Sequence, residues 1–344
     1  MTSFESDYNN GAHPAILQQL LDTNDQQSAS YGYDTWSQQA RQKIRAACQC
    51  PDADIYFLVG GTQANATVID ALLPSYGAVV SVETAHINVH ESGAVEASGH
   101  KVITLPSHQG RMAANDLRLY LQNFHNDPTW EHMAYPGMVY ITFPTELGTI
   151  YQASEIAAIH DVCQQFSIPL FIDGARLGYG LAASGCDITL PFIASHCEAF
   201  YIGGTKVGAL CGEAVVFPCG APPHFFTIIK RHGALLAKSR LAGVQFNALF
   251  TNDLYFSISC HAIEMAMRLR RIFIENQIPI KESPTNQQFV VLTRQQQEKL
   301  LEHVLFETWE PLDQDHTLCR FVTSWATSDE DLRQLASALE GIKE

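Results

Sequence analysis

Residues 197–208 read Cys197-Glu-Ala-Phe-Tyr-Ile-Gly-Gly-Thr-Lys206-Val-Gly208, and the rest of the chain is organised around this stretch. An apolar run ends at a Gly-Gly pair and Lys206 follows, so the pattern places a lysine at the mouth of a buried sheet. Burial disfavours the ammonium form, and a partly neutral lysine can attack a carbonyl group to form a Schiff base. The alternative is a structural lysine that extends its head to water from a strand end. Taken alone, the stretch favours that alternative, but the residues around it reverse the preference.

Short apolar runs recur along the first two thirds of the chain and alternate with helical patterns. Strands are predicted at residues 54–59, 78–82, 101–105, 138–143, 169–172, 199–202 and 213–217. Helices are predicted at residues 35–48, 63–73, 87–97, 115–124 and 154–166, with Asn115 and Ser154 as N-caps. This alternation predicts an α/β fold with a mainly parallel central sheet covered on both faces. Such sheets bind ligands beyond the carboxyl ends of their strands.

The two ends of the chain differ from this middle part. Residues 1–30 are polar and turn-rich, with a helix predicted at 13–21, and we expect an arm that packs near a small domain or on a partner subunit. Residues 31–250 form the predicted large domain, and residues 251–344 a small C-terminal α+β domain. In the small domain, helices are predicted at 252–275, at 296–303 and from residue 329, and strands at 288–292 and 317–323.

Composition limits the class of protein. A formal net charge of −15 over 344 residues argues against nucleic acid or an anionic membrane as the main partner. The nine cysteines show neither a disulfide framework nor a zinc pattern, so we expect reduced thiols, no metal site and a cytoplasmic location. The N-terminus lacks a secretory signal, and no apolar run approaches the length of a membrane span.

Three further patterns lie where predicted strands end. Gly60-Gly61-Thr62-Gln63 joins a strand to a helix, and the N–H groups of a helix start can bind an anion such as phosphate. The carboxylate of Asp173 can pair with a protonated ring nitrogen or cap a helix, and the imidazole of His86 can stack on a flat ring or fill a core. Along the chain the order is a phosphate-binding turn, a histidine, an acid at a strand end and then Lys206. Pyridoxal phosphate requires these four features of a protein: a phosphate site, a stacking residue, a partner for the ring nitrogen and a Schiff-base lysine.

With these motifs in place, the chain resembles the L-threonine aldolases of the low-specificity type. These belong to the aspartate-aminotransferase-like, fold-type I pyridoxal-phosphate enzymes, in which a large cofactor domain carries the central sheet. The resemblance covers nearly the whole chain. It rests on Ser6-Asp7, Tyr31-Gly32-x-Asp34, Gly61-Thr62-x-x-Asn65, His86, Pro144-Thr-Glu-Leu-Gly148, Ile172-Asp-Gly-Ala-Arg176, the Lys206 segment, Ser239-Arg-Leu-Ala-Gly-Val244 and Cys319-Arg-Phe-Val-Thr323.

The resemblance implies a cofactor site built on Lys206. This lysine would form the Schiff base with pyridoxal 5'-phosphate, Asp173 would pair with the pyridine nitrogen, and His86 would stack on the ring. The phosphate would be held at Gly61, Thr62 and Gln63. Arg176 and Arg240 would also contact the cofactor or the substrate. Arg240 could reach the site from a neighbouring subunit.

The resemblance also implies a substrate site. Arg176 and Arg320 would clamp the substrate carboxylate, with Ser6 beside them. Tyr31 and His90 are further candidates for substrate binding. The base that removes the β-hydroxyl proton would be His86 or His132, or a phosphate-bound water.

Two positions depart from the pattern of the family. His90 stands where members commonly carry a tyrosine. Gly233 stands where some members place a basic residue on the phosphate, with Arg231 as a candidate replacement. These departures bear on the pocket for the substrate's β-substituent and on the phosphate cradle.

The function implied is cleavage of L-threonine, L-allo-threonine or related β-hydroxy-α-amino acids, such as phenylserine, to glycine and an aldehyde. The alternatives are another fold-type I reaction (β-elimination, racemisation or transamination) and a cofactor-binding protein with little catalysis. A nicotinamide-binding fold is disfavoured because no GxGxxG opens the first strand–helix turn. The resemblance further implies a homo-oligomer, a dimer or a dimer of dimers (a homotetramer), with shared active sites.

Overall fold

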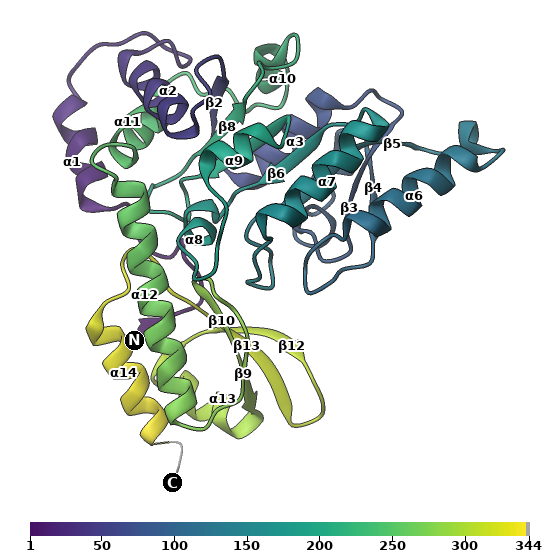
Figure 1. Cartoon of the computed structure of the whole chain (residues 1–344). Coiled ribbons are helices and arrows are strands. Elements are labelled where there is room, and N and C mark those ends of the chain that lie inside the picture. Colours follow the sequence, from purple (N-terminus) through teal and green to yellow (C-terminus); the bar gives the residue numbers. More distant parts are fainter. Residues whose placement is uncertain (342–344) are drawn as a thin grey trace.

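A seven-stranded sheet forms the centre of the large domain, with strand order β2-β8-β7-β6-β5-β3-β4. The computed structural model describes residues 1–341 (Figure 1). Strand β8 alone runs antiparallel to its neighbours, so the sheet is mainly parallel, as the sequence predicts. The strands are β2 (Asp54–Leu58), β3 (Gly77–Val82), β4 (Lys101–Leu105), β5 (Tyr135–Thr142), β6 (Leu170–Asp173), β7 (Ala199–Gly203) and β8 (Glu213–Phe217).

Helices cover both faces of this sheet. Every residue of β3, β6, β7 and β8 is buried, which requires cover on both sides and explains their continuous apolar sequences. The covering and flanking helices are α2 (Thr35–Cys48), α3 (Gly61–Leu72), α4 (His86–Val89), α5 (Ala94–Ala97), α6 (Ala114–Asn126), the 3₁₀-helix η1 (Trp130–His132), α7 (Ala153–Phe166), α8 (Leu177–Leu181), α9 (Leu190–Ser195), α10 (Phe225–Arg231) and α11 (Arg240–Leu249).

The helix predicted at residues 87–97 is wrong. The structure has two short helices there, α4 and α5, and the chain turns between them at Ser92 and Gly93, whose φ angles are +52° and +74°. Glycine adopts such angles without steric cost, so Gly93 ends the helical run. The break brings the Glu91 side chain back toward His86.

Two predicted N-caps are also wrong. Helix α7 begins at Ala153 behind a capping box made by Gln152 and Glu155, so Ser154 lies inside the helix. Helix α6 begins at Ala114 without a side-chain cap.

A second, smaller sheet forms the C-terminal part of the molecule (Figure 1). It is antiparallel, with order β12-β13-β10-β9, and its edge strand β12 was not predicted from the sequence. The long helix α12 contributes residues to the cores of both parts. The elements are α12 (Leu254–Glu275), β9 (Ile280–Lys281), β10 (Gln287–Thr293), α13 (Arg294–Leu301), β11 (Val304–Leu305), β12 (Glu307–Pro311), β13 (His316–Val322) and α14 (Asp329–Glu340).

The N-terminal residues lie across both parts of the molecule. Strand β1 (Thr2–Ser3) pairs with β11, and Phe4 is buried in the core of the smaller part. The His13 amide donates to the Gly208 carbonyl at 2.8 Å, which holds the start of α1 (Pro14–Thr23) beside the Lys206 segment. In the described part of the chain, none of the helices has the length and apolarity needed to cross a membrane.

Candidate active site

The predicted site residues on the central sheet meet at one edge. Strands β2, β3, β5, β6 and β7 run in the same direction, so the turns that follow them lie together. A cavity at this edge is lined by residues from all five turns: Gly61, His86, Thr142, Pro144, Glu146, Asp173, Ala175, Arg176, Tyr201 and Lys206.

Lys206 lies in the turn after β7 with its side chain at the cavity wall. Its carbonyl accepts a hydrogen bond of 2.5 Å from the Tyr179 hydroxyl, which fixes the backbone of the turn. Burial lowers the pKa of Lys206 below its ordinary value, and the charge of Arg176 adds to that effect. Within residues 1–341 the lysine Nζ has no hydrogen-bond partner; it lies 5.9 Å from the centre of the Tyr8 ring. The amine is therefore free to react.

Asp173 ends β6 and is 2% exposed. Its Oδ2 accepts from the Tyr140 hydroxyl at 2.6 Å and from Asn65 Nδ2 at 3.0 Å, and its Oδ1 accepts from the Ala175 amide at 2.9 Å. Burial alone would raise the pKa of Asp173, but the charge of His86 and hydrogen bonds that include those from Tyr140 and Ala175 lower it below its ordinary value. The site therefore holds a buried carboxylate in its ionised form.

His86 begins α4 between two buried glutamates. Its Nδ1 lies 2.7 Å from Glu91 Oε1, and its backbone amide donates to Glu146 Oε1 at 2.9 Å. Glu91 Oε1 also accepts from Asn65 Nδ2 at 2.7 Å. The Asn65 side-chain amide therefore links Glu91 to Asp173. An ionised carboxylate only accepts hydrogen bonds, so this contact assigns the proton of a neutral imidazole to Nδ1. In that tautomer Nε2 is the hydrogen-bond acceptor.

The start of α3 has the features of an anion site. The N-cap residue Gly60 provides no side-chain cap, and within the described chain the amides of Gly61, Thr62 and Gln63 make no hydrogen bond. The buried Tyr201 hydroxyl, also without a partner there, would lie 3.0 Å from a Cβ placed at Gly61. The Gln63 side chain instead accepts from the Val59 amide at 3.1 Å, so the backbone provides the cradle.

These features fit pyridoxal phosphate. The unpartnered amides at the start of α3 and the Tyr201 hydroxyl suit a phosphate group. The ionised Asp173 suits a protonated ring nitrogen, and Lys206 supplies an unpaired amine in the same cavity. The His86 ring, with about 33% of its side chain exposed, borders the same cavity.

Both arginines predicted to bind substrate are held by acids of the chain. Arg176 donates to Asp7 from Nε at 2.7 Å and from one terminal nitrogen at 3.1 Å. Arg320 on β13 donates to Gln287 Oε1 at 2.9 Å and pairs with Glu307 through its other terminal nitrogen. The Nε of Arg320 is buried without a partner in the described residues. The Ser6 hydroxyl, nearby in sequence to Asp7, donates to Asn9 Oδ1 at 2.6 Å.

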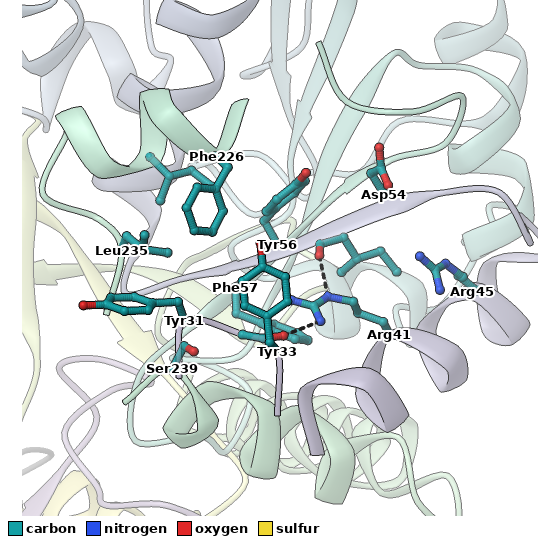
Figure 2. Close-up of a pocket in the computed structure, with 13 residues that line it drawn as sticks. Tyr31, Tyr33, Arg41, Arg45, Asp54, Tyr56, Phe57, Phe226, Leu235 and Ser239 are labelled. Carbon is teal, nitrogen blue, oxygen red and sulfur yellow. Dashed lines mark hydrogen bonds between the residues drawn. The ribbon is translucent and has the colours of Figure 1, made fainter. Parts of the chain in front are cut away.

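Three predicted residues lie elsewhere in this chain. Arg240 donates to the Gln26 and Thr23 carbonyls at 2.7 and 2.6 Å. His132 ends η1, before the amino end of β5, and so lies at the sheet edge opposite Lys206. Tyr31 lines a second cavity, whose aromatic rings gather near the Arg41 guanidinium (Figure 2).

Sequence reasoning missed several residues that build the site. The buried carboxyls of Glu91, Glu146 and Glu213 were given no role, although each is an acid within an apolar or motif-bearing segment. Glu213 Oε1 accepts from the Thr205 hydroxyl at 2.8 Å and its Oε2 accepts from the Gly204 amide at 3.1 Å. An acid opening an otherwise apolar strand was the available signal for Glu213.

This sheet and cavity define a class, the enzymes with the aspartate-aminotransferase architecture. A family model described as beta-eliminating lyase matches residues 4–275, so the chain belongs to the beta-eliminating lyase family. The family and the fold imply pyridoxal phosphate as the cofactor.

Comparison with individual proteins narrows the likeness to the threonine aldolases. A low-specificity L-threonine aldolase of a Pseudomonas species is 28% identical over 98% of this chain and 97% of its own length. The solved threonine aldolase of Leishmania major is 35% identical, with a TM-score of 0.95 and full coverage of both chains. The aspartate aminotransferase of Thermus thermophilus shares the fold, with a TM-score of 0.70 at 14% identity, over 99% of this chain and 91% of its own. The predicted family and fold class are therefore confirmed.

Proposed function

We propose that this protein is a pyridoxal-phosphate-dependent aldolase. It cleaves L-threonine, L-allo-threonine or related β-hydroxy-α-amino acids to glycine and an aldehyde. The observation that carries this proposal is the convergence of a free buried amine, an ionised carboxylate and an uncapped helix start in one cavity, in a chain similar over its full length to threonine aldolases. Other reactions of the same fold type are the alternative.

In this proposal Lys206 is the covalent attachment point for the cofactor's aldehyde carbon. The lowered pKa of Lys206, caused first by burial, keeps part of the amine neutral, as nucleophilic attack requires. Asp173 would hold the ring nitrogen in its protonated form, and the start of α3 would hold the phosphate. When bound, the cofactor supplies an electron sink for the bond that breaks at Cα.

Arg320 and Arg176 are the proposed anchors of the substrate carboxylate. A guanidinium matches a carboxylate with two parallel N–H donors, which sets orientation as well as affinity. Arg320 offers its unpartnered Nε, and Arg176 has one terminal nitrogen that Asp7 does not use. Fixing the carboxylate would orient Cα in the site and so select which of its bonds is cleaved.

His86 is the proposed base for the β-hydroxyl proton. Glu91 holds the His86 ring through Nδ1, so Nε2 is the nitrogen that can accept a proton on the cavity side. His132, the other candidate, lies at the opposite sheet edge of its own chain and could act only in the site of another copy. The structure therefore favours His86.

We also propose an oligomer with shared sites, a dimer or a dimer of dimers, in the cytoplasm. Arg240, Tyr31 and His132, which the family resemblance assigns to the site, lie away from the Lys206 cavity of their own chain. Exposed apolar side chains gather near Tyr31, including Tyr33 and Phe226. A second copy would cover them. A monomer in light scattering would contradict this arrangement.

The first experiment uses the purified protein loaded with pyridoxal phosphate. L-Threonine, L-allo-threonine and L-phenylserine are supplied separately, and free aldehyde and glycine are measured. We expect equimolar aldehyde and glycine. Pyruvate with ammonia, or a keto acid, in place of these products would overturn the aldol reaction while leaving the fold and the cofactor site.

A variant tests the role of Lys206. Lys206→Ala should release no aldehyde above background and should carry no cofactor after borohydride reduction, as read by mass spectrometry. Lys101→Ala, at an exposed position at the start of β4, is the matched control. It should still release aldehyde and should still carry the cofactor after borohydride reduction. Normal cleavage by Lys206→Ala would contradict the proposal.

A further inference from the structure

The edge strand β12 of the small sheet carries a β-bulge at Trp309. Along β12 and β13, Thr308 pairs with Cys319 and Glu310 pairs with Leu318, so Trp309 is the extra residue between them. A bulge redirects the side chain of the strand that contains it, and bulges occur often beside active sites. The bulge thus accounts for Trp309 turning toward the large domain from an exposed strand.

Trp309 lies between two predicted substrate-binding residues. The Arg320 guanidinium carbon is 4.7 Å from the centre of the Trp309 ring, within the range of a cation–π contact. The centre of the indole is also 6.1 Å from the ring of His90, on the large domain, and 5.5 Å from the ring of Phe289 in an edge-to-face arrangement. Trp309 therefore connects the carboxylate anchor to the segment that carries His86.

The four side chains form one continuous wall. The rings of His90 and His86 are 5.6 Å apart, so the order along the wall is Arg320, Trp309, His90, His86. A β-hydroxy amino acid that contacts Arg320 through its carboxylate and His86 through its hydroxyl lies alongside this wall. The substituent on Cβ then faces the middle of the wall, where the rings of Trp309 and His90 lie.

We propose that Trp309, together with His90, forms the subsite for the substrate's β-substituent and favours an aromatic group there. This inference rests on the proposed aldol function. An aromatic substituent can stack on the indole and imidazole, whereas the methyl group of threonine makes a much smaller contact. Trp309 is thus a specificity-determining residue supplied by the small domain.

The test compares substrates in the holoenzyme. For Trp309→Ala we expect kcat/KM for L-phenylserine to fall about three- to tenfold more than kcat/KM for L-threonine, the size of an aromatic pair. A common rise in KM for both substrates should accompany this, because Arg320 loses its support. Trp309→Phe keeps a ring and should retain a phenylserine-to-threonine ratio within about twofold of the unaltered protein.

A binding measurement gives a readout independent of turnover. L-Phenylalanine and L-alanine lack the β-hydroxyl and cannot release an aldehyde, so their Kd values can be read from the absorbance of the bound cofactor. In Trp309→Ala the Kd for L-phenylalanine should rise more than the Kd for L-alanine. Glu310→Ala, an exposed neighbour on the same strand, is the control and should shift neither ratio.

The outcomes separate the two proposals. If the unaltered protein releases aldehyde but the phenylserine-to-threonine ratio in Trp309→Ala is unchanged or rises, the subsite is wrong and the aldol function stands. If the unaltered protein releases no aldehyde from any substrate, the proposed function itself fails. Should Trp309→Ala not fold, His90→Ala tests the same wall and should lower the same ratio.

Discussion

At the scale of single residues, the cavity holds buried carboxyl groups whose protonation differs. Burial raises the pKa of Glu146 and raises the pKa of Glu213 to about 8. Burial acts on Asp173 too, but His86 and hydrogen bonds from Tyr140 and Ala175 outweigh it and lower the pKa of that group. Near neutral pH Asp173 is therefore ionised while Glu213 holds its proton, which limits the repulsion between these two acids.

Glu213 makes the stability of the protein depend on pH. Its folded-state pKa of about 8 lies above the ordinary value of 4.5, so its contribution to stability is present at low pH and is lost as pH rises through about 8. Glu213→Gln cannot ionise. We expect its free energy of unfolding to change less between about pH 5 and pH 9, by about 4 kcal/mol, in urea titrations of the cofactor-free protein.

At low pH, where Glu213 is protonated, the variant should be the less stable protein, because an amide nitrogen in place of Oε2 cannot accept the hydrogen bond from the Gly204 amide. The diagnostic quantity is the slope of the free energy of unfolding against pH. The exposed Glu310→Gln is the control and should keep the slope of the unaltered protein. Equal slopes in all three proteins would show that Glu213 does not titrate in this range.

At the scale of elements, helix α3 begins at the point where a ligand phosphate would sit. Its first amides are unpartnered in the described chain, and the helix dipole adds positive potential there. Glycine at Gly61 keeps this surface open, because a Cβ would approach the Tyr201 hydroxyl to 3.0 Å. A helix start that lacks a side-chain cap is a weakness in a helix unless a ligand supplies the missing acceptors.

Gly61→Ala should weaken cofactor retention without unfolding the protein. A methyl group would narrow the space in front of the free amides, and we expect the Kd for pyridoxal phosphate to rise about tenfold. Equilibrium dialysis measures this directly. Gly11→Ala is the matched control, because a Cβ at Gly11 meets nothing within 4 Å. Unaltered retention in Gly61→Ala would place the phosphate elsewhere.

At the scale of the whole molecule, one ion pair joins three parts of the chain. Asp7 of the N-terminal segment pairs with Arg176 after β6, and Asn286, before β10, donates to Asp7 Oδ2 at 2.9 Å. Burial alone would raise the pKa of Asp7, but Arg176 and Lys206 outweigh it and lower that pKa below its ordinary value. The segment thus ties the large and small parts together beside Lys206.

Asp7→Asn should destabilise the protein by about 3 kcal/mol at neutral pH, because Arg176 would remain buried without its partner. A lowered folded-state pKa gives stability that is present above the unfolded value of 3.8 and is lost as pH falls through the folded value. The difference between the two proteins should therefore shrink in acid. Urea unfolding at several pH values measures it, with the exposed Asp52→Asn as control. A difference that is constant with pH would contradict this account.

Mixing two inactive variants tests whether sites are shared between copies. Lys206→Ala and Arg240→Ala would each disable every site of their own homodimers. A hybrid dimer would have one site with both residues intact, so random mixing should restore about one quarter of full activity. The assay is aldehyde release after joint refolding, and each variant refolded alone is the control. No recovery would mean that Arg240 acts within its own chain or not at all.

The sequence by itself determined the mainly parallel sheet and the cluster of Gly61, His86, Asp173 and Lys206. Both follow from local patterns. Buried parallel strands are continuous apolar runs, and residues placed just after such strands must meet at one edge. The helix predicted at 87–97 failed because periodicity does not report a turn such as the one at Gly93. The strand β12 was missed because its residues are largely exposed and carry no apolar run.

Only the tertiary structure decided which distant side chains complete the cavity. Asp7 meets Arg176, and Trp309 meets His90, across long separations in the sequence, and no local pattern encodes such contacts. The structure likewise placed His132 at the far sheet edge, although its type and position in the sequence suited a catalytic base. The physical reason is that burial, pKa and hydrogen bonding belong to a packed environment, which exists only once the segments have come together.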